Sequence, residues 1–425
     1  MQTAKDSSLT NLFDVERIRQ DFPTISPDTI YLDSLASSLT PFPVIEAMTE
    51  YYTKHCANVH WGTYDLSLQA PEQFQHAIAN IARFIGAQPE EVVVTSNATQ
   101  ALNEIAMTLN FAPGDEVLIS SIEHSSNILP WMRLVETNGI KMQWYKTGKS
   151  GHFDMEQFEQ CLTPKTRLVS FTYVSSVVGS IVPVEEVGKL CHERNIRFLV
   201  DASQAVPHLP IDVKRIDCDF MVFSGHKMLG PTGVGIMYMK LDMAKTLLPA
   251  FMGGGTLDTS ACSCTSLDTC SIDDCTFSDL PLKWSVGTPP IAEMLGLSAA
   301  VDYLNAIGFE AIQRHEAQLM RRAHTGLLTI PGIELFGPEK PEERCSILSF
   351  NIGTLPPFEV GRMLHEQFQI AVRGGDHCVI KYYRDEEERG LLPKGNVRAS
   401  FYLYNTEEEV DRFLSAIETI ARTCL

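Results

Sequence analysis

The chain has 425 residues, of which 44% are hydrophobic and 20% charged, as is usual for a globular protein. Its net charge of −19 disfavours nucleic acid or an anionic membrane as the main partner, because phosphate groups require clustered Lys and Arg. No apolar run reaches the roughly 18 residues of a spanning helix, and the N-terminus lacks a targeting pattern. We therefore expect a cytoplasmic protein whose eleven cysteines are thiols, ligands or nucleophiles rather than disulfides.

Strand and helix patterns alternate through the first part of the chain. Strands are predicted at residues 91–95, 116–120, 141–145, 167–173, 196–200, 219–223 and 235–239. Helices are predicted at residues 69–85, 99–109, 128–138, 154–161 and 184–195. In the first of these helices, Pro71 is expected near the first turn, where its missing N–H costs nothing. The alternation predicts an α/β domain with a mainly parallel sheet covered by helices on both faces.

The pattern changes after residue 290. Long helices are predicted at residues 291–307 and 310–329, followed by strands at 346–351, 370–373 and 397–402 and by helices at 357–368 and 406–422. This order predicts a smaller α+β domain. We expect a large domain at residues 29–305 and a small domain formed by residues 1–28 and 306–425. A Cys-rich loop at residues 256–279 interrupts the large domain.

Two residues at the ends of predicted strands indicate a cofactor. Lys227 follows strand 219–223, and Asp201 follows strand 196–200. A lysine that forms a Schiff base and a carboxylate that holds a protonated pyridine nitrogen are what a pyridoxal phosphate (PLP) enzyme needs most. Open α/β sheets build their sites at such strand ends. Gln204 is placed to donate to the phenolic oxygen of the ring.

The turn at residues 95–99 joins a strand to a helix and is a candidate phosphate site. The backbone at Ala98 and Thr99, together with the Thr99 hydroxyl, offers donors at a helix N-terminus. A plain N-cap is the alternative. Ser224 and His226 flank Lys227 and add further donors.

Two more side chains suit an amino-acid substrate. His124 follows a strand, where an imidazole can stack on the ring and act as an acid or base. Arg398 begins a strand of the small domain, and a guanidinium grips a carboxylate through two parallel hydrogen bonds. Taken singly, each has a plainer interpretation, as a loop histidine and as a surface salt bridge.

Together these residues resemble the fold-type I, class V aminotransferase-like family. Within it they most resemble the group II cysteine desulfurases, the SUF-type and selenocysteine-lyase-like enzymes. The resemblance runs from about residue 30 to residue 406. Its most specific segments are Asn58-Val59-His60, Glu123-His124 with Asn127-Ile128-Leu129-Pro130-Trp131, Asp201-Ala202-Ser203-Gln204-Ala205, Ser224-Gly225-His226-Lys227, Gly287-Thr288-Pro289, Val372-Arg373-Gly374-Gly375-Asp376-His377-Cys378 and Arg398-Ala399-Ser400.

The resemblance implies a role for each residue. Lys227 would carry PLP and later move the substrate α-proton, while His124 would stack on the ring. The ring and phosphate would be held by Ala98, Thr99, Asp201, Gln204, Ser224 and His226, and by Thr288 acting across a homodimer interface. The substrate would be bound by Arg398, Arg373, Ser176 and His60.

Cys378 falls where desulfurases keep their nucleophile. The implied reaction converts L-cysteine to L-alanine and leaves a persulfide on Cys378, which supplies sulfur to an acceptor protein for iron–sulfur clusters or other sulfur compounds. A thiolate is the reactive form, and we expect His124, Arg373 or His377 to favour it. Whether cysteine, selenocysteine or cystine is preferred stays open.

Three departures from the family pattern leave alternatives open. Ser176 replaces an asparagine that normally touches both ring and substrate, and residues 379–384 lack the usual small and proline residues. A class V lyase, epimerase or aminotransferase acting on another amino acid is therefore the alternative function. The third departure is a C-x-C-x5-C-x4-C pattern formed by Cys262, Cys264, Cys270 and Cys275. It suggests a site for a metal ion or an Fe–S cluster. The alternatives are a loop whose thiols have no function and thiols that relay sulfur from Cys378. The remaining hypothesis is that the protein is a non-catalytic metal-binding scaffold.

Overall fold

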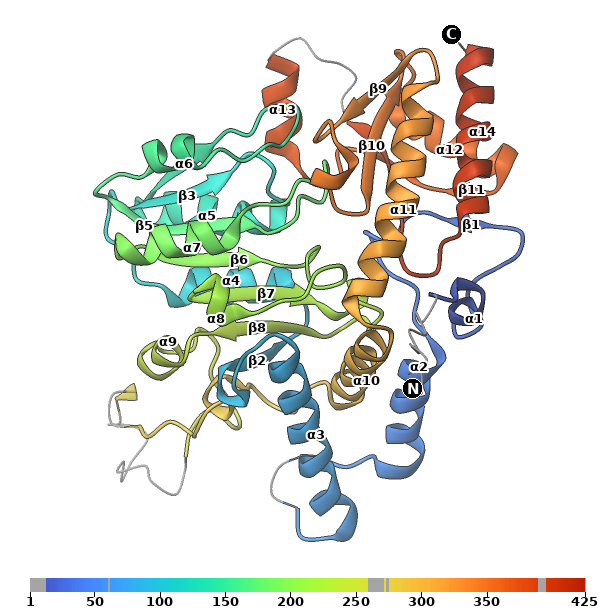
Figure 1. Ribbon diagram of the computed structural model, residues 1–425. Helices are drawn as coiled ribbons and strands as arrows, with labels where there is room; N and C mark the ends of the chain where they lie inside the picture. Colours follow the sequence, from blue (N-terminus) through green and yellow to red (C-terminus); the bar gives the residue numbers. More distant parts are fainter. Residues whose placement is uncertain (1–12, 60–61, 259–270, 273–274, 389–394, 425) are drawn as a thin grey trace, which may run out of the picture.

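The computed structural model describes residues 13–59, 62–258, 271–272, 275–388 and 395–424 (Figure 1). Its centre is a seven-stranded sheet in the order β2-β8-β7-β6-β5-β3-β4. The strands are β2 (Val92–Thr95), β3 (Glu116–Ser120), β4 (Lys141–Tyr145), β5 (Thr166–Thr172), β6 (Arg197–Asp201), β7 (Phe220–Ser224) and β8 (Gly235–Met239). β8 pairs antiparallel with both neighbours, and the other pairs are parallel. The sheet is therefore mainly parallel, as predicted.

Helices cover both faces of this sheet because alternate strand residues point to opposite sides. In β6, Leu199 packs in one apolar core, whereas Phe198 and Val200 pack in another. The Leu199 core includes α4 (Ala98–Thr108) and α5 (Leu129–Asn138). The other includes α3 (Asp65–Phe84), α6 (Met155–Cys161), α7 (Val184–Glu193), α8 (Val213–Ile216) and α10 (Ile291–Ile307). Burial on both faces explains why these strands are continuously apolar.

A second, antiparallel sheet lies beside the first (Figure 1). Its order is β12 (Arg373–Gly375), β13 (Asn396–Ser400), β10 (Ile347–Ile352), β9 (Ile333–Phe336). Its apolar core includes residues of α11 (Phe309–Leu328), α12 (Pro357–Phe368) and α14 (Glu407–Cys424). Near it, β1 (Ile30–Tyr31) pairs in parallel with β11 (Ile370–Ala371). The α/β class with a smaller α+β part is confirmed, while the division at residues 28/29 and 305/306 stays a prediction.

Several local predictions need correction. The helix expected at residues 69–85 begins at Asp65, so Pro71 lies inside it rather than near its first turn. Ser67 Oγ both accepts from Tyr64 N and donates to Tyr64 O, which caps the helix a turn earlier. The strand expected at 370–373 is split into β11 and β12. Some short elements were not predicted, namely β1, α8, β9, α1 (Val15–Arg19), α2 (Phe42–Glu50), α9 (Leu241–Thr246) and α13 (Ile380–Glu388). Within the described ranges, every helix is too short or too polar to cross a membrane.

Candidate active site

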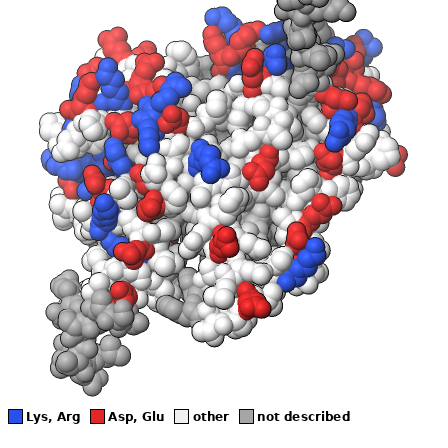
Figure 2. All heavy atoms as spheres, turned by 60° about the horizontal axis from the view of Figure 1, so that its bottom comes forward, with Lys and Arg blue, Asp and Glu red and all other residues white. Residues whose placement is uncertain are grey.

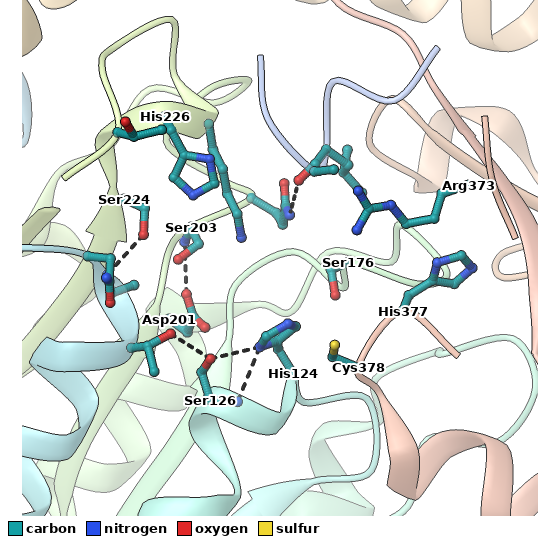
Figure 3. Close-up of a pocket in the computed structure, with 18 of the residues that line it drawn as sticks. His124, Ser126, Ser176, Asp201, Ser203, Ser224, His226, Arg373, His377 and Cys378 are labelled. Atoms are coloured by element: carbon teal, nitrogen blue, oxygen red, sulfur yellow. Dashed lines mark hydrogen bonds between the residues drawn. The ribbon is translucent and has the colours of Figure 1, made fainter. Parts of the chain in front are cut away.

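A cavity of about 430 Å³ lies where the two sheets meet (Figure 3). Asp201 and Ser224 reach it from the carboxyl ends of β6 and β7. Arg373 and Arg398 reach it from β12 and β13 of the second sheet. The site is therefore built from both parts of the fold.

Lys227 lies on a 3₁₀ turn, Gly225–Lys227, that directly follows the buried strand β7. Burial lowers the pKa of Lys227, and the negative charge of Asp201 partly opposes this effect. Asp201 is 6% exposed and accepts a hydrogen bond from Ser203 N at 3.0 Å. A lysine with a lowered pKa has more of the neutral amine, which is the form that attacks a carbonyl.

The N-terminus of α4 forms one end of the cavity. Ala98 N donates to Ser224 Oγ at 2.9 Å, and Thr99 Oγ1 lies 2.7 Å from Ser126 Oγ. A Cβ on Gly235 would lie 2.5 Å from the Asn97 Cα, so only glycine lets β8 approach this helix end so closely. The helix end and hydroxyls make an anion site.

His124 stands in the middle of the cavity, between Asp201 and Cys378 (Figure 3). Its Nδ1 accepts a hydrogen bond from Ser126 N at 3.2 Å, so the ring proton is assigned to Nε2. Burial, aided by the charge of Lys227, lowers the pKa of His124 to about 4. The imidazole is therefore neutral near pH 7.

Next to His124 in the chain, Glu123 is fully buried and accepts hydrogen bonds from Ser120 Oγ, Thr172 N and Asn127 Nδ2. Burial raises the pKa of Glu123 to about 8. This network ties the segment that carries His124 to β3 and β5.

The two arginines share a carboxylate. Arg373 Nη2 lies 3.1 Å from Asp33 Oδ2, and Arg398 Nη2 lies 3.6 Å from Asp33 Oδ1. Arg398 Nη1 donates to the Ser176 carbonyl at 2.8 Å, while Arg398 Nε and the Ser176 hydroxyl are buried without a protein partner. Burial lowers the pKa of Arg398 to about 10. The guanidinium thus stays charged at neutral pH and keeps a free donor.

Cys378 is an exposed free thiol that lines the same cavity. His377 and Cys378 both adopt left-handed backbone, with φ of 50° and 58°. Burial lowers the pKa of His377 to about 3, and its Nε2 lies 2.8 Å from Asn396 Oδ1. Near neutral pH, His377 and His124 are therefore uncharged and do not favour a Cys378 thiolate through a positive charge. Of the three residues expected to do so, Arg373 is the remaining candidate.

The other predicted site residues line the cavity, lie outside its wall, or fall outside the residues that the structure describes. His226 lines the cavity, and burial lowers its pKa to about 4. Thr288 is exposed and is not part of the cavity wall. His60, Cys262, Cys264 and Cys270 lie outside the described residues. Cys275 is among the described residues, and within these no three or more His, Cys, Asp or Glu side chains form a group that could hold a metal ion.

Four residues of the site were not singled out from the sequence: Asp33, Ser125, Ser126 and Ser203. Ser125 and Ser126 lie between the quoted residues His124 and Asn127, and Ser203 stands in a quoted segment, whereas Asp33 lies in none of them. Their contacts depend on the fold and gave no separate signal.

The cavity fits pyridoxal phosphate. It combines an anion site at α4, a lysine with a lowered pKa and a buried carboxylate. Gln204 Nε2 donates to the Leu35 carbonyl at 3.1 Å, and Gln204 Oε1 is buried without a partner. Since an amide nitrogen carries two hydrogens, one donor remains for the ring oxygen.

The fold and site define an α/β enzyme built to hold an aldehyde cofactor through a lysine. The aminotransferase class-V family model matches residues 30–413, and the chain belongs to that family. It is 38% identical to a probable cysteine desulfurase from Streptomyces coelicolor, with 97% of this chain and 99% of the relative covered.

Two solved structures are similar throughout. A cysteine desulfurase from Thermococcus onnurineus is 36% identical, with a TM-score of 0.88 over 96% of this chain and 98% of that one. The cysteine desulfurase CsdA from Escherichia coli is 28% identical, with a TM-score of 0.86 over 98% and 100%. The resemblance seen in the sequence is confirmed at the family level, and the group II assignment stays a prediction.

Proposed function

We propose that this protein is a PLP-dependent cysteine desulfurase that converts L-cysteine to L-alanine and leaves the sulfur as a persulfide on Cys378. The observation that carries the proposal is a single cavity lined by Lys227, Asp201, Arg398 and Cys378. These are an amine, an acid, a carboxylate receptor and a nucleophile. Relatives named cysteine desulfurase support it over nearly the whole chain.

When bound, pyridoxal phosphate supplies an electron-withdrawing ring that stabilises negative charge at the substrate α-carbon. Lys227 would hold the cofactor and move the substrate α-proton, and Asp201 would keep the ring nitrogen protonated. His124 would lie against the ring, and Ala98, Thr99, Ser224 and His226 would hold the phosphate.

Arg398, with Arg373 beside it, orients the substrate carboxylate. The Cys378 thiolate attacks the substrate Sγ and forms an S–S bond. The Sγ–Cβ bond breaks, its electron pair stays on the carbon fragment, and that fragment is protonated to alanine. The sulfur then passes from Cys378 to an acceptor protein.

The test is purified protein incubated with L-cysteine, with alanine measured by chromatography and persulfide located by mass spectrometry. We expect Cys378→Ala to lose desulfurase activity by at least about a hundredfold while it still changes the cofactor spectrum on cysteine addition. Cys424→Ala, at another exposed free thiol, is the matched control. A Cys378→Ala protein that makes alanine at the wild-type rate would refute the proposal.

Ser176 favours a second candidate, a lyase, epimerase or aminotransferase acting on another amino acid. Its hydroxyl is buried without a partner at the point where the family asparagine would act. Such an enzyme would turn over its substrate without Cys378, so the same variant separates the two functions.

We also propose that the protein is a homodimer. Charged side chains are sparse in the middle of the face in Figure 2. Large apolar side chains are exposed on α2 and at the start of α3, among them Phe42, Ile45, Leu66 and Leu68. Thr288, exposed and outside its own cavity, is then free to reach the partner's phosphate site. Light scattering of the holoenzyme gives the mass, and a monomer would contradict this assembly.

The remaining predictions concern the cellular location of the protein, the use of the sulfur and the Cys-rich loop. We propose a cytoplasmic enzyme that supplies sulfur for iron–sulfur clusters. For the loop with Cys262, Cys264, Cys270 and Cys275, a metal ion or cluster stays a proposal that iron and acid-labile sulfide assays of anaerobic protein decide. A scaffold without PLP would show no cofactor absorbance and no effect of Lys227→Ala.

A further inference from the structure

The short turn after β3 contacts three parts of the site through three successive residues. His124 stands in the cavity, and Ser126 Oγ lies 2.7 Å from Thr99 Oγ1 at the start of α4 (Figure 3). Between them, Ser125 begins the 3₁₀ turn Ser125–Asn127 and points to the segment that carries Cys378. One turn therefore connects the imidazole, the start of α4 and the backbone of Cys378.

Ser125 holds the Cys378 carbonyl twice. Its backbone N–H donates to Cys378 O at 2.7 Å, and its hydroxyl donates to the same oxygen at 2.8 Å. Ser125 follows β3 of the large sheet and Cys378 follows β12 of the small sheet, so the contact spans the two parts of the fold. A carbonyl oxygen has two lone pairs and accepts both bonds.

The backbone at Cys378 needs such support. His377 and Cys378 are consecutive non-glycine residues in left-handed conformation, which persists only where surrounding contacts enforce it. His377 is anchored by Asn396, and Val379 is fully buried. Cys378 lies between these anchors with an exposed side chain, and within its own segment its N–H donates to Asp376 Oδ1 at 3.0 Å. The other backbone polar group of Cys378, its carbonyl, accepts both hydrogen bonds from Ser125.

We propose that Ser125 is a positioning residue that sets the place of the Cys378 thiol relative to the His124 imidazole. This rests on the proposed function, in which Cys378 attacks the substrate sulfur. Nucleophilic attack demands close alignment of the reacting atoms, and a misplacement of about 1 Å costs up to about a hundredfold. Because Ser125 contacts the Cys378 backbone and does not line the cavity, its loss should slow sulfur transfer and leave substrate binding intact.

Three substitutions at Ser125 remove one, none or both of its hydrogen bonds to the Cys378 carbonyl. Ser125→Ala removes the hydroxyl bond and keeps the N–H bond, while Ser125→Thr keeps both. Ser125→Pro removes both bonds. His124 has φ −63° and ψ 147°, a conformation that tolerates a following proline, and Pro suits the first residue of a helical turn. Ser150→Ala is the control, because it removes another loop hydroxyl, one that accepts from His152 N outside the cavity.

The holoenzymes are mixed with L-cysteine, and persulfide on Cys378 is followed by rapid quench and mass spectrometry. We expect the rate constant to fall about five- to tenfold in Ser125→Ala and about a hundredfold in Ser125→Pro. Ser125→Thr and Ser150→Ala should stay within about twofold of wild type. The cysteine concentration that half-saturates the cofactor spectrum should not change. Hydrogen exchange of residues 376–380 should quicken in the same order as the rates fall.

Wild-type persulfide rates in both Ser125→Ala and Ser125→Pro would overturn the inference and leave the proposed function intact. So would a loss of rate that tracks weaker cysteine binding or cofactor loss, since Ser125 would then act through His124. If the wild type forms no persulfide on Cys378, the proposed function fails and this inference fails with it.

Discussion

Arg398→Lys tests the substrate end of the cavity. Arg398 is 4% exposed, its Nη1 is committed to the Ser176 carbonyl, and its Nε is buried without a partner. Lysine keeps the charge but loses the planar fork that binds a carboxylate through two bonds. A hydrogen bond to a charged group contributes about 1.5–3 kcal/mol, so we expect the KM for L-cysteine to rise by roughly 10- to 150-fold.

The measurement is alanine formation across a range of L-cysteine concentrations, together with a spectral titration of the cofactor. If Arg398 orients the carboxylate, both half-saturation values rise, while kcat at saturation falls less. Arg362→Lys, on the exposed face of α12, is the matched control. An unchanged KM and an unchanged titration in Arg398→Lys would show that the carboxylate binds elsewhere and refute the reasoning.

Two further predictions concern stability. Burial raises the pKa of Glu104 from its usual 4.5 to about 7, so the folded protein resists its ionisation and loses stability as pH rises from about 4.5 to 7. Glu104→Gln should therefore raise the free energy of unfolding by roughly 3 kcal/mol at pH 8 and by little near pH 4.5. Equal shifts in melting temperature at both pH values would contradict this pH dependence. His208 Nδ1 lies 2.9 Å from Glu316 Oε1, both are 4% exposed, and Ser346 Oγ donates to the same carboxylate. His208→Ala leaves the buried Glu316 carboxyl without its imidazole partner and should cost about 3–5 kcal/mol in denaturant unfolding. A loss below about 1 kcal/mol would mean that the pair does not tie α11 to the large sheet.

The cofactor side of the site was predictable because its residues follow strong local patterns. Lys227 and Asp201 come directly after apolar runs that become the buried strands β7 and β6. Parallel strands place their carboxyl ends at one edge of a sheet, so the order of these strands was enough to bring the two residues together.

The structure differed where local signals compete. Pro71 favoured a helix start, but the Tyr64–Ser67 cap moved that start to Asp65. The residues after Cys378 lacked the family pattern, yet they form α13, because Val379 and Tyr382 bury against Ile122, Val177 and Val178.

By itself, the sequence determined the α/β class, the strands of the large sheet and the lysine and aspartate at their ends, since burial of alternating or continuous apolar runs is a local property. Only the tertiary structure decided that Asp33 bridges Arg373 and Arg398 and that Ser125 holds Cys378. Those pairs are distant in the chain and belong to different elements. Their meeting depends on how the small sheet packs against the large one, and no pattern within a short window encodes that packing.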